Sequence, residues 1–307
     1  MRLSDIRFSP SGRSGGFTLI ELLVVISLFA VLAILQWPAL VQAKLRSQDI
    51  SCLNNMQQLQ AACFLYSGDN NDFMPVNSPL SPSYGGDSSS PGIYQGDPCW
   101  VDGTFAAGGV GSDNPPGCAT NAFYLGVEGT TLNGVTLTGS IGPYVKQAGA
   151  YHCPADKSLA PAYEGGGPRV RSCSMNMMVG TTPAPSSAGG AQYGVATQYS
   201  ANKSYKYFRK LSDFNSKMSA SQCFVLLDEN PASLNDGWLE YFIAGNGIGD
   251  TPAVNHGSSS SFSFADGHVE FHKWADTFLR SPVLYHAGDQ DPVWLANHGT
   301  YFDILQQ

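Results

Sequence analysis

The sequence predicts an α+β fold, in which one long N-terminal helix packs on an antiparallel β-sheet head that carries long loops. Three observations support this class. A 19-residue apolar run, Phe17 to Leu35, makes a helix of roughly 28 Å, about the thickness of the hydrocarbon core of a bilayer. Apolar residues then recur at helical spacing as far as Tyr66, and short alternating runs separated by Gly, Pro and Ser occupy the rest of the 307 residues.

Glu21 is the one charged residue of the apolar run. A carboxylate near the middle of a membrane helix costs about 2.5–3.5 kcal/mol on insertion scales, and such residues usually mark function. Glu21 therefore needs a partner. A cut between Gly16 and Phe17 would supply one, since the new α-amine of Phe17 on a neighbouring subunit could meet Glu21.

This segment resembles the N-terminus of type IV prepilins and type II secretion pseudopilins. Their pattern is a short basic leader that ends in Gly and is followed by Phe-Thr-Leu-Ile-Glu, and Gly16 to Leu23 reads GFTLIELL. Pro38 lies 22 residues into the mature chain, where members of that family often carry a helix-kinking proline. The resemblance assigns Gly16 and Phe17 to cleavage and methylation, and Glu21 and Pro38 to assembly.

The same resemblance implies a domain organisation and partners. Residues 1–16 would be a leader, 17–67 the pilin helix with 17–37 in the membrane, and 68–307 an extracytoplasmic pilin-like head. A prepilin peptidase would remove the leader and methylate Phe17. The further partners would be other pilin or pseudopilin subunits and an inner-membrane assembly platform. The location would be the bacterial inner membrane, with a single pass, and then a periplasmic or cell-surface filament.

Two other interpretations of the N-terminus stay open. An ordinary secretory signal would use the leader arginines as its basic region and Val41-Gln42-Ala43 as its cleavage site. Its apolar core would have about 7–15 residues and no carboxylate, whereas this run is longer and contains Glu21. An uncleaved membrane anchor explains the length of the run and leaves Glu21 unexplained.

Composition and charge favour an extracytoplasmic head. Only 13% of the residues are charged, while Gly, Ser, Pro and Asn are plentiful, as in loop-rich extracytoplasmic proteins. The net charge of −8 becomes more negative once the basic leader is removed. An acidic head argues against nucleic acid as a direct partner.

The 7 cysteines fit an oxidising compartment, and their odd number leaves at least one unpaired. Cys99 with Cys118 and Cys153 with Cys173 are the predicted disulfides, because each pair brackets a turn-rich segment. No Cys-x-x-Cys pair occurs, so structural zinc is not expected.

Beyond Pro38 the helix is expected to continue to about Tyr66 with one apolar stripe, which must pack on the sheet of the head. The stripe comprises Leu45, Cys52, Leu53, Met56, Leu59, Cys63 and Tyr66. Gly68 is placed to end the helix. The run Asp69 to Asp72 is read as a solvated turn, because it lacks the glycine and the distal glutamate of a calcium loop.

Several segments of the head have a readable pattern. Ser78 to Asp97 and Thr181 to Gly190 are expected to be surface loops. Ala122 to Val127 is a candidate short strand, and Cys223 to Asp228 a buried strand. The C-terminal segment is expected to form an extra strand or helix around Trp294.

Three motifs stand in a fixed order along the head. A Cys-Pro-x-Asp turn, Cys153 to Asp156, precedes an Arg-Ser-x-Ser-Met-Asn strand, and His256 is followed after nine residues by Asp266-Gly267. These motifs resemble those of large pilin-like proteins abundant in planctomycetes, verrucomicrobia and their relatives. The resemblance marks as structural motif residues Cys153, Asp156, His256, Asp266 and Gly267.

Asp266-Gly267 lies between two alternating runs and predicts a β-hairpin with a two-residue turn. In that register Phe264 faces Val269 and Phe262 faces Phe271, so the four apolar side chains share one face. The other face collects Ser263, His268, Glu270 and His272.

His268, Glu270 and His272 are candidate metal ligands, because they alternate along one strand and supply nitrogen and oxygen atoms. Asp228, Glu229 and His256 are candidates to fold near them. The alternative is an ordinary polar face, with His256 and Asp266 fixing turns by backbone hydrogen bonds. No Gly-x-Ser-x-Gly, His-Glu-x-x-His or phosphate-binding glycine loop occurs, so catalysis has no sequence support.

The sequence therefore predicts a structural subunit, a pseudopilin or minor pilin of a type II secretion or type IV pilus-like filament, and not an enzyme. No cofactor is expected; calcium is the metal suggested by analogy with secretion pseudopilins. The alternative function is a membrane-anchored extracytoplasmic metal-binding protein or enzyme that uses the face of His268, Glu270 and His272.

Overall fold

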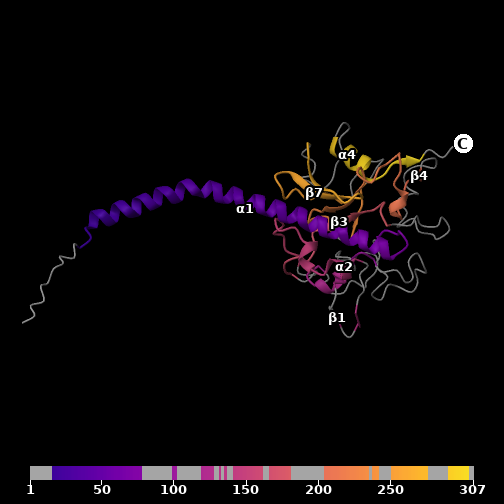
Figure 1. The fold of residues 1–307 in the computed structure, drawn as a ribbon, viewed down its shortest axis with the longest axis horizontal. Coiled ribbons are helices and arrows are strands. Elements are labelled where there is room, and N and C mark those ends of the chain that lie inside the picture. Colours follow the sequence, from indigo (N-terminus) through magenta and orange to yellow (C-terminus); the bar gives the residue numbers. More distant parts are fainter. Residues whose placement is uncertain are drawn as a thin grey trace, which may run out of the picture. The chain divides into compact units, whose positions relative to one another are not determined.

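The chain is organised in two compact units. A computed structural model describes residues 16–77, 99–101, 119–127, 131–132, 135–136, 141–161, 166–180, 204–234, 237–241, 250–275 and 290–303. The two units are Met1–Arg46 and Ser47–Gln307. The helix α1, Leu19–Asp69, contributes residues to both (Figure 1). The long N-terminal helix predicted from the sequence is confirmed.

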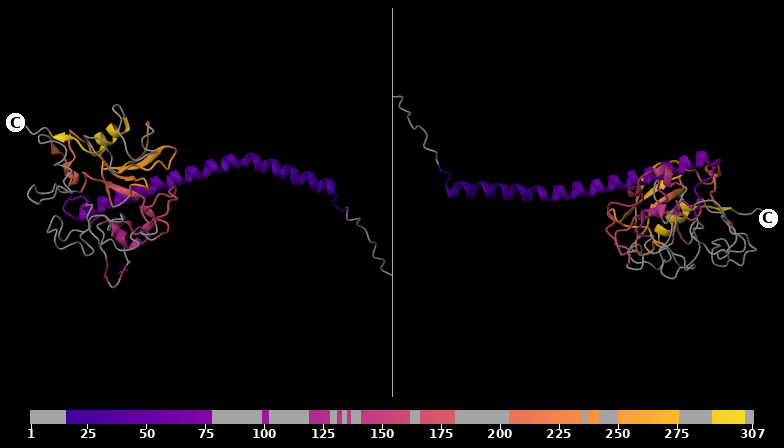
Figure 2. Two further views of the ribbon diagram at one scale, coloured as in Figure 1. Left: turned by 180° about the vertical axis from the view of Figure 1, so that it is seen from behind. Right: turned by 90° about the horizontal axis from the view of Figure 1, so that it is seen from below.

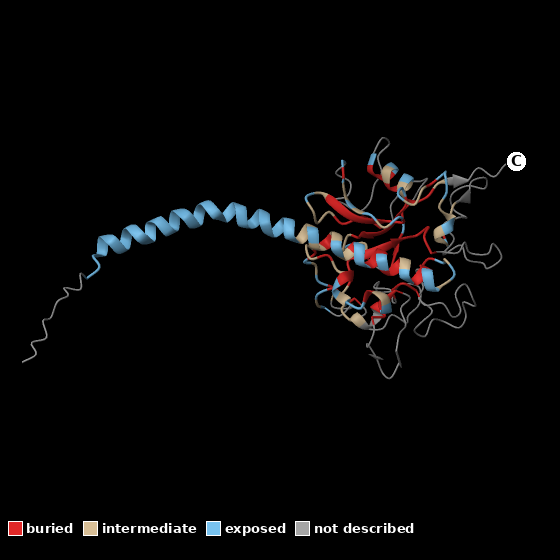
Figure 3. Ribbon diagram, in the orientation of Figure 1, coloured by how far each residue is buried: buried red, intermediate tan, exposed pale blue. Residues whose placement is uncertain are grey.

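The first unit consists of an apolar stretch of α1 with no cover of its own. Every described residue from 16 to 46 is exposed, as the pale blue ribbon in Figure 3 shows. Leu45, which was assigned to the packed stripe, is exposed as well. Among the described residues α1 is the one helix long and apolar enough to cross a membrane. Pro38 lies inside it.

In the second unit α1 has one buried face. Its buried apolar residues are Cys52, Met56, Leu59, Ala62, Cys63 and Tyr66. They recur at spacings of three and four, as one side of an α-helix requires, and they confirm the predicted stripe from Cys52 onward. The helix ends at Asp69, and positive φ angles at Asn71 (54°) and Asp72 (73°) turn the chain there.

A five-stranded sheet forms the centre of the second unit, in the order β6-β3-β5-β7-β8. Its strands are β3 (Cys173–Asn176), β5 (Phe224–Asp228), β6 (Trp238–Leu239), β7 (Ser259–Phe264) and β8 (Val269–Lys273). Every residue of β5 is buried, which confirms the predicted buried strand.

The sheet is mixed, which corrects the prediction of an antiparallel sheet. Three of its four pairings are antiparallel, but β6 runs parallel to β3. The chain leaves β5, crosses to the far side of β3 and returns in the direction opposite to β5. Because β5 is itself antiparallel to β3, this crossing makes β6 parallel to β3.

The two faces of the sheet pack against different elements. On one face, α1 residues such as Leu59 join Met175 and Val225 in one hydrophobic cluster, and Figures 1 and 2 show this part of α1 alongside the strands. On the other face, Phe224 and Phe262 form a second cluster with residues of α4 (Gln290–Gly299). The sheet is therefore buried from both sides, which explains why all six residues of β7 are buried.

Shorter elements complete the described part of the head. They are η1 (Ala122–Leu125), β1 (Thr131–Leu132), β2 (Val135–Thr136), α2 (Gly142–Val145), η2 (Ala148–Tyr151), β4 (Ser204–Tyr205), η4 (Leu211–Asp213) and β9 (Phe302–Asp303). β1 pairs with β2, and β4 with β9.

Two sequence predictions are settled by these elements. The expected strand at Ala122 to Val127 is wrong, because its first four residues form a 3-10 helix. The expected extra element around Trp294 is confirmed by α4 and β9. The loops expected at Ser78 to Asp97 and Thr181 to Gly190 lie outside the described residues.

The β7–β8 hairpin exists, but its predicted register is wrong. Ser263 pairs with Val269 and Phe262 with Glu270, because the loop has three residues rather than two. Gly267 N–H donates to the carbonyl of Phe264 at 2.9 Å, and φ of Gly267 is +100°, as in a type I turn followed by a left-handed residue. One extra loop residue shifts the pairing by one position. Each side chain of β7 then shares its face of the sheet with those β8 side chains that were predicted to lie on the other face.

The shifted register also separates the apolar side chains. Phe262 and Phe264 lie on the α4 face, in the second cluster. Val269 packs against the cluster on the α1 face. Ser263 lies on the same face, where its hydroxyl donates to Gln60 of α1 at 3.0 Å. The face predicted to be polar is thus the α4 face, where His268, Glu270 and His272 accompany the two phenylalanines.

Gly267 is expected to be intolerant of a side chain. A Cβ at this position would lie 2.9 Å from Cε2 of Phe64 on α1, and φ would have to stay at +100°. We expect Gly267→Ala to lower the free energy of unfolding of the full-length protein in detergent by roughly 1–3 kcal/mol. Gly68→Ala is the control, because no atom crowds a Cβ there and its backbone is helical. Equal stabilities of the two variants would contradict this account.

Candidate functional site

The N-terminus of α1 is closed by a reciprocal cap between Thr18 and Glu21. The Thr18 backbone N–H and hydroxyl both donate to Glu21 Oε2 at 2.8 Å, and the Glu21 N–H donates to Thr18 Oγ1 at 3.2 Å. This is the capping box of a Thr-x-x-Glu sequence. Glu21 therefore has a partner within its own chain, which the sequence analysis missed although the spacing was readable.

The predicted cleavage point lies immediately before this cap. Phe17 is 79% exposed, and the space around Gly16 is open among the described residues. A peptidase would reach the bond between them without unfolding any described element. Glu21, four residues further on, also lies in the exposed unit, where a second chain would have access to it.

The second unit brings four metal-binding side chains together. Sγ of Cys52, Sγ of Cys153, a carboxylate oxygen of Asp228 and a ring nitrogen of His256 all lie within 4.8 Å of one another. It is the one group of this kind among the described residues. The four residues come from α1, the turn after η2, the end of β5 and the loop before β7.

Close contacts link the members of this four-residue cluster. His256 Nε2 lies 3.1 Å from Cys153 Sγ. The thiol of Cys52 donates to Asp228 Oδ2 at 2.9 Å. Cys52, Cys153 and Asp228 are at most 2% exposed, so the cluster is closed off from water.

A second layer of polar side chains orients the cluster. Asp49, one turn before Cys52 on α1, contacts His256 Nδ1 at 2.7 Å. The hydroxyls of Ser172 and Ser261 donate to the two oxygens of Asp228 at 3.1 and 2.6 Å. Each of these residues fixes the direction in which its partner points.

Electrostatics distribute the charges of the cluster unevenly. The contact with Cys153 and burial raise the pKa of Cys52, and burial also raises the pKa of Asp228. The hydrogen bond with Cys52 and the His256 ring lower the pKa of Cys153. Burial alone would lower the pKa of His256, but Cys153 and Asp49 raise it. The cluster thus places a thiol whose pKa is lowered, Cys153, beside two groups whose pKa values are raised, Cys52 and Asp228.

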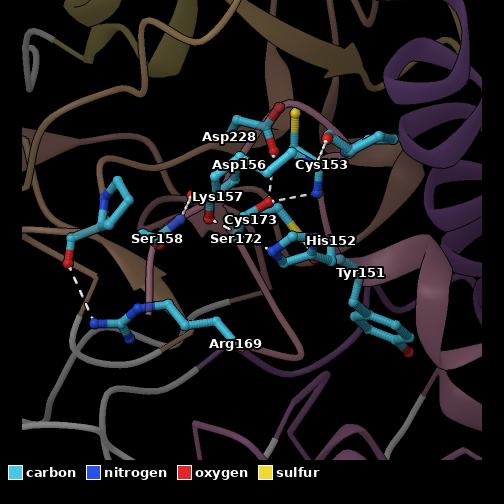
Figure 4. Close-up of polar contacts among 12 residues, drawn as sticks. Tyr151, His152, Cys153, Asp156, Lys157, Ser158, Arg169, Ser172, Cys173 and Asp228 are labelled. Carbon is cyan, nitrogen blue, oxygen red and sulfur yellow. Dashed lines mark hydrogen bonds and ion pairs between the residues drawn. The ribbon is translucent and has the colours of Figure 1, made fainter. Parts of the chain in front are cut away.

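The Cys-Pro-x-Asp turn holds Cys153 in place. The N–H of Asp156 donates to the carbonyl of Cys153 at 3.0 Å, and the carboxylate of Asp156 accepts from the N–H of Ser158 at 2.8 Å. The N–H of Cys153 donates to Ser172 Oγ at 2.7 Å, which ties the turn to the start of β3. Figure 4 shows Cys153, Ser172 and Asp228 joined in this way. Asp156 is a turn residue and lies outside the four-residue cluster.

The spacing of the His-x9-Asp-Gly motif follows from strand β7. His256 stands just before the strand, and Asp266 and Gly267 form the turn just after it. Asp266 accepts hydrogen bonds from the N–H of His268 at 3.1 Å and contacts its Nδ1 at 2.6 Å. Asp266 thus fixes its turn as expected. For His256, the expected backbone contact is replaced by the ring contacts to Cys153 and Asp49.

His268, Glu270 and His272 are not gathered into a metal site. His268 stacks on Phe264 with ring centroids 4.2 Å apart, and His272 stacks on Trp294 at 3.6 Å. The imidazoles are thus engaged by aromatic rings instead of converging on a common point. Of the additional ligands considered from sequence, Asp228 and His256 lie in the four-residue cluster instead. The two aspartates at the end of α1 bond elsewhere. Asp69 accepts from the Tyr144 hydroxyl at 2.7 Å, and Asp72 accepts from the N–H of Ser212 at 3.1 Å.

The predicted disulfide between Cys153 and Cys173 is wrong. Both thiols are free, and Cys173 donates to the carbonyl of Tyr151 at 3.4 Å while Cys153 contacts His256. The turn between them is closed by hydrogen bonds to Ser172 instead. The predicted pair Cys99 and Cys118 cannot be followed, because Cys118 lies outside the described residues.

Comparison with known proteins identifies the N-terminus. Residues 12–35 match the family model of the prokaryotic N-terminal methylation motif. The chain has the N-terminus of a type IV prepilin-like protein. The matched segment contains Gly16, Phe17 and Glu21, and this part of the sequence-based resemblance is confirmed. No curated protein and no solved structure matches the chain, and the likeness of the head to planctomycete proteins stays a prediction.

The His272 stack predicts a pH-dependent stability. Burial and the nearby His298 lower the pKa of His272 to about 4, from an ordinary value of about 6.5. The unfolded chain therefore binds a proton that the folded chain resists, and stability falls as pH decreases from about 6.5 to about 4. We expect His272→Phe, which keeps a ring on Trp294, to reduce this loss in denaturant titrations. An unchanged pH dependence would contradict the assignment.

Proposed function

We propose that the protein is a structural subunit, a pseudopilin or minor pilin, of a type II secretion or type IV pilus-like filament. The proposal rests on the methylation motif at residues 12–35. The motif lies at the start of an apolar helix, and every helix residue in the first unit of the chain is exposed. This motif implies processing by a prepilin peptidase and assembly with other pilins.

The exposed half of α1 needs an apolar environment. Its large apolar residues are exposed, and Leu28, Phe29 and Ile34, for example, are between 59% and 71% exposed. In water such a surface would drive aggregation, whereas the lipid bilayer and a bundle of neighbouring helices both cover it. A pilin-type helix uses both in turn, first as a membrane anchor in the inner membrane and then as the core of a filament.

The role of Glu21 changes with processing. In the precursor its carboxylate caps α1 through Thr18. Removal of residues 1–16 would create a positive amine at Phe17 next to this cap, and in a filament the amine of a neighbouring subunit would neutralise Glu21. An unpaired carboxylate in an apolar core is costly, so this pairing would favour the correct stagger of subunits.

The head supports a structural role and an extracytoplasmic position. Its net negative charge and its loop-rich composition suit that position. Cys153, His256 and Asp49 are spaced like a nucleophile, a base and the carboxylate that orients the base, but Cys153 is only 2% exposed and is closed to a substrate. We therefore assign the protein no catalytic step. The sequence alternative that placed a metal on the face of His268, Glu270 and His272 has no support from the geometry.

Substitutions at the cap separate the two roles of Glu21. We expect Glu21→Ala to insert into membranes normally but to be lost from filaments sheared from the native host, because the intersubunit charge pair is missing. Thr18→Ala is the matched control, since it removes the hydroxyl cap at a cost of about 1 kcal/mol and keeps the carboxylate. Normal incorporation of Glu21→Ala would rule out the pairing, and an equal defect in both variants would assign Glu21 to capping alone.

A further inference from the structure

We infer that Cys52, Cys153, Asp228 and His256 form a structural zinc site that fastens α1 to the head. All four residues lie in the second unit, so the inference goes beyond the proposed filament role and does not depend on it. The sequence predicts Asp228 and His256 as possible ligands but does not connect them with the two cysteines, because consecutive ligands are separated by between 28 and 101 residues along the chain.

The donor set matches zinc. Two sulfurs, one imidazole nitrogen and one carboxylate oxygen are ligands that zinc accepts in tetrahedral sites, whereas calcium and magnesium require oxygen. At usual zinc bond lengths, adjacent ligand atoms of a tetrahedron are separated by roughly 3.3–3.8 Å. The four ligand atoms already lie within 4.8 Å of one another, with individual contacts of 2.9 and 3.1 Å. Shifts of a fraction of an ångström would accommodate the ion.

The surroundings of the cluster are those of a metal site. Zinc-bound histidines almost always give their second ring nitrogen to a carboxylate or carbonyl, and here Asp49 contacts Nδ1 of His256 at 2.7 Å while Nε2 points at Cys153. The carboxylate of Asp228 is oriented by Ser172 and Ser261 in the same manner. No local sequence pattern marks these partners, because Asp49 lies on α1, Ser172 just before β3 and Ser261 on β7.

Charge also favours a cation at this position. Asp228 is 1% exposed, and no described lysine or arginine forms an ion pair with it. Two thiols next to this carboxylate would carry three negative charges if all were ionised, which is unfavourable in a buried site without a positive ion. A divalent cation would neutralise most of that charge and release the protons. A disulfide between Cys52 and Cys153 would not explain why Asp228 and His256 also point at the two sulfurs.

The site would act as a cross-link. It would join α1, the Cys-Pro-x-Asp turn, β5 and the loop before β7 near the first residues of α1 that belong to the second unit. Four protein ligands leave no open position, so the zinc would be structural and not catalytic. A pulling force on α1 in a filament would then be carried by metal bonds as well as by the hydrophobic contact with the sheet.

The test is the zinc content of the full-length protein, purified in detergent with a reducing agent and without a metal-affinity step. We expect one zinc per chain by elemental analysis. Replacement by Co²⁺ should give the thiolate charge-transfer and visible bands of a tetrahedral sulfur-containing site. The cobalt spectrum uses the unaltered chain, so it does not depend on whether a variant folds.

Two buried cysteines of α1 provide matched variants. Cys52→Ala should lose the zinc, whereas Cys63→Ala, at a buried cysteine of the same helix outside the cluster, should retain it. Asp49→Asn, which keeps the four ligands, should weaken zinc binding about 10–100-fold in competition with a chelator.

Three results would overturn the inference. The first is a chain that takes up no stoichiometric zinc when zinc is supplied. The second is zinc retained by Cys52→Ala, or lost equally from Cys63→Ala. The third is a Cys52–Cys153 disulfide in peptide maps of the protein isolated from its native host.

Discussion

The packing of α1 on the sheet is the contact on which the rest of the head depends. The helix closes one face of β3, β5 and β7 and supplies Met56, Leu59 and Cys63 to a cluster that no strand could complete alone. Close approach requires small side chains on the strand opposite, and β7 presents Ser261 and Ser263 to α1, bonded to Asp228 and Gln60. Packing against α1 therefore accounts for Ser261 and Ser263, two of the four serines of β7.

The same helix also sets the environment of the protein. One half is buried on one side only, and the other half is apolar and exposed throughout. A single element thus couples a folded head to a segment that is stable only in lipid or among other helices. The filament proposal and the inferred zinc site both concern this element, the first at its free half and the second where the packed half begins.

Sequence periodicity predicted the parts of the fold that depend on local pattern. The apolar run, the stripe of α1 and the continuous apolar strand β5 were all readable, because each follows from the spacing of neighbouring residues. The hairpin was found from Asp266-Gly267, but its register was not, since one additional loop residue reverses the faces without changing the motif. The parallel pairing of β6 with β3 depends on a crossing that no local pattern encodes.

Sequence reasoning named two members of the four-residue cluster, Asp228 and His256, but could not assemble the cluster, for a related reason. Its ligands have no short spacing, and the absence of a Cys-x-x-Cys pair argued against zinc, whereas the tertiary fold brings together four segments. The capping box of Thr18 and Glu21 is the opposite case. Its Thr-x-x-Glu spacing is visible in the sequence, but Glu21 was assigned only to a partner on another subunit.

The measurement that tests the central claim most directly is mass spectrometry of the mature N-terminus, on protein taken from membranes of the native host. The account predicts a chain that begins at N-methylated Phe17. An N-terminus at Lys44 would indicate an ordinary secreted protein, and an intact Met1 an uncleaved anchor; either result would contradict it.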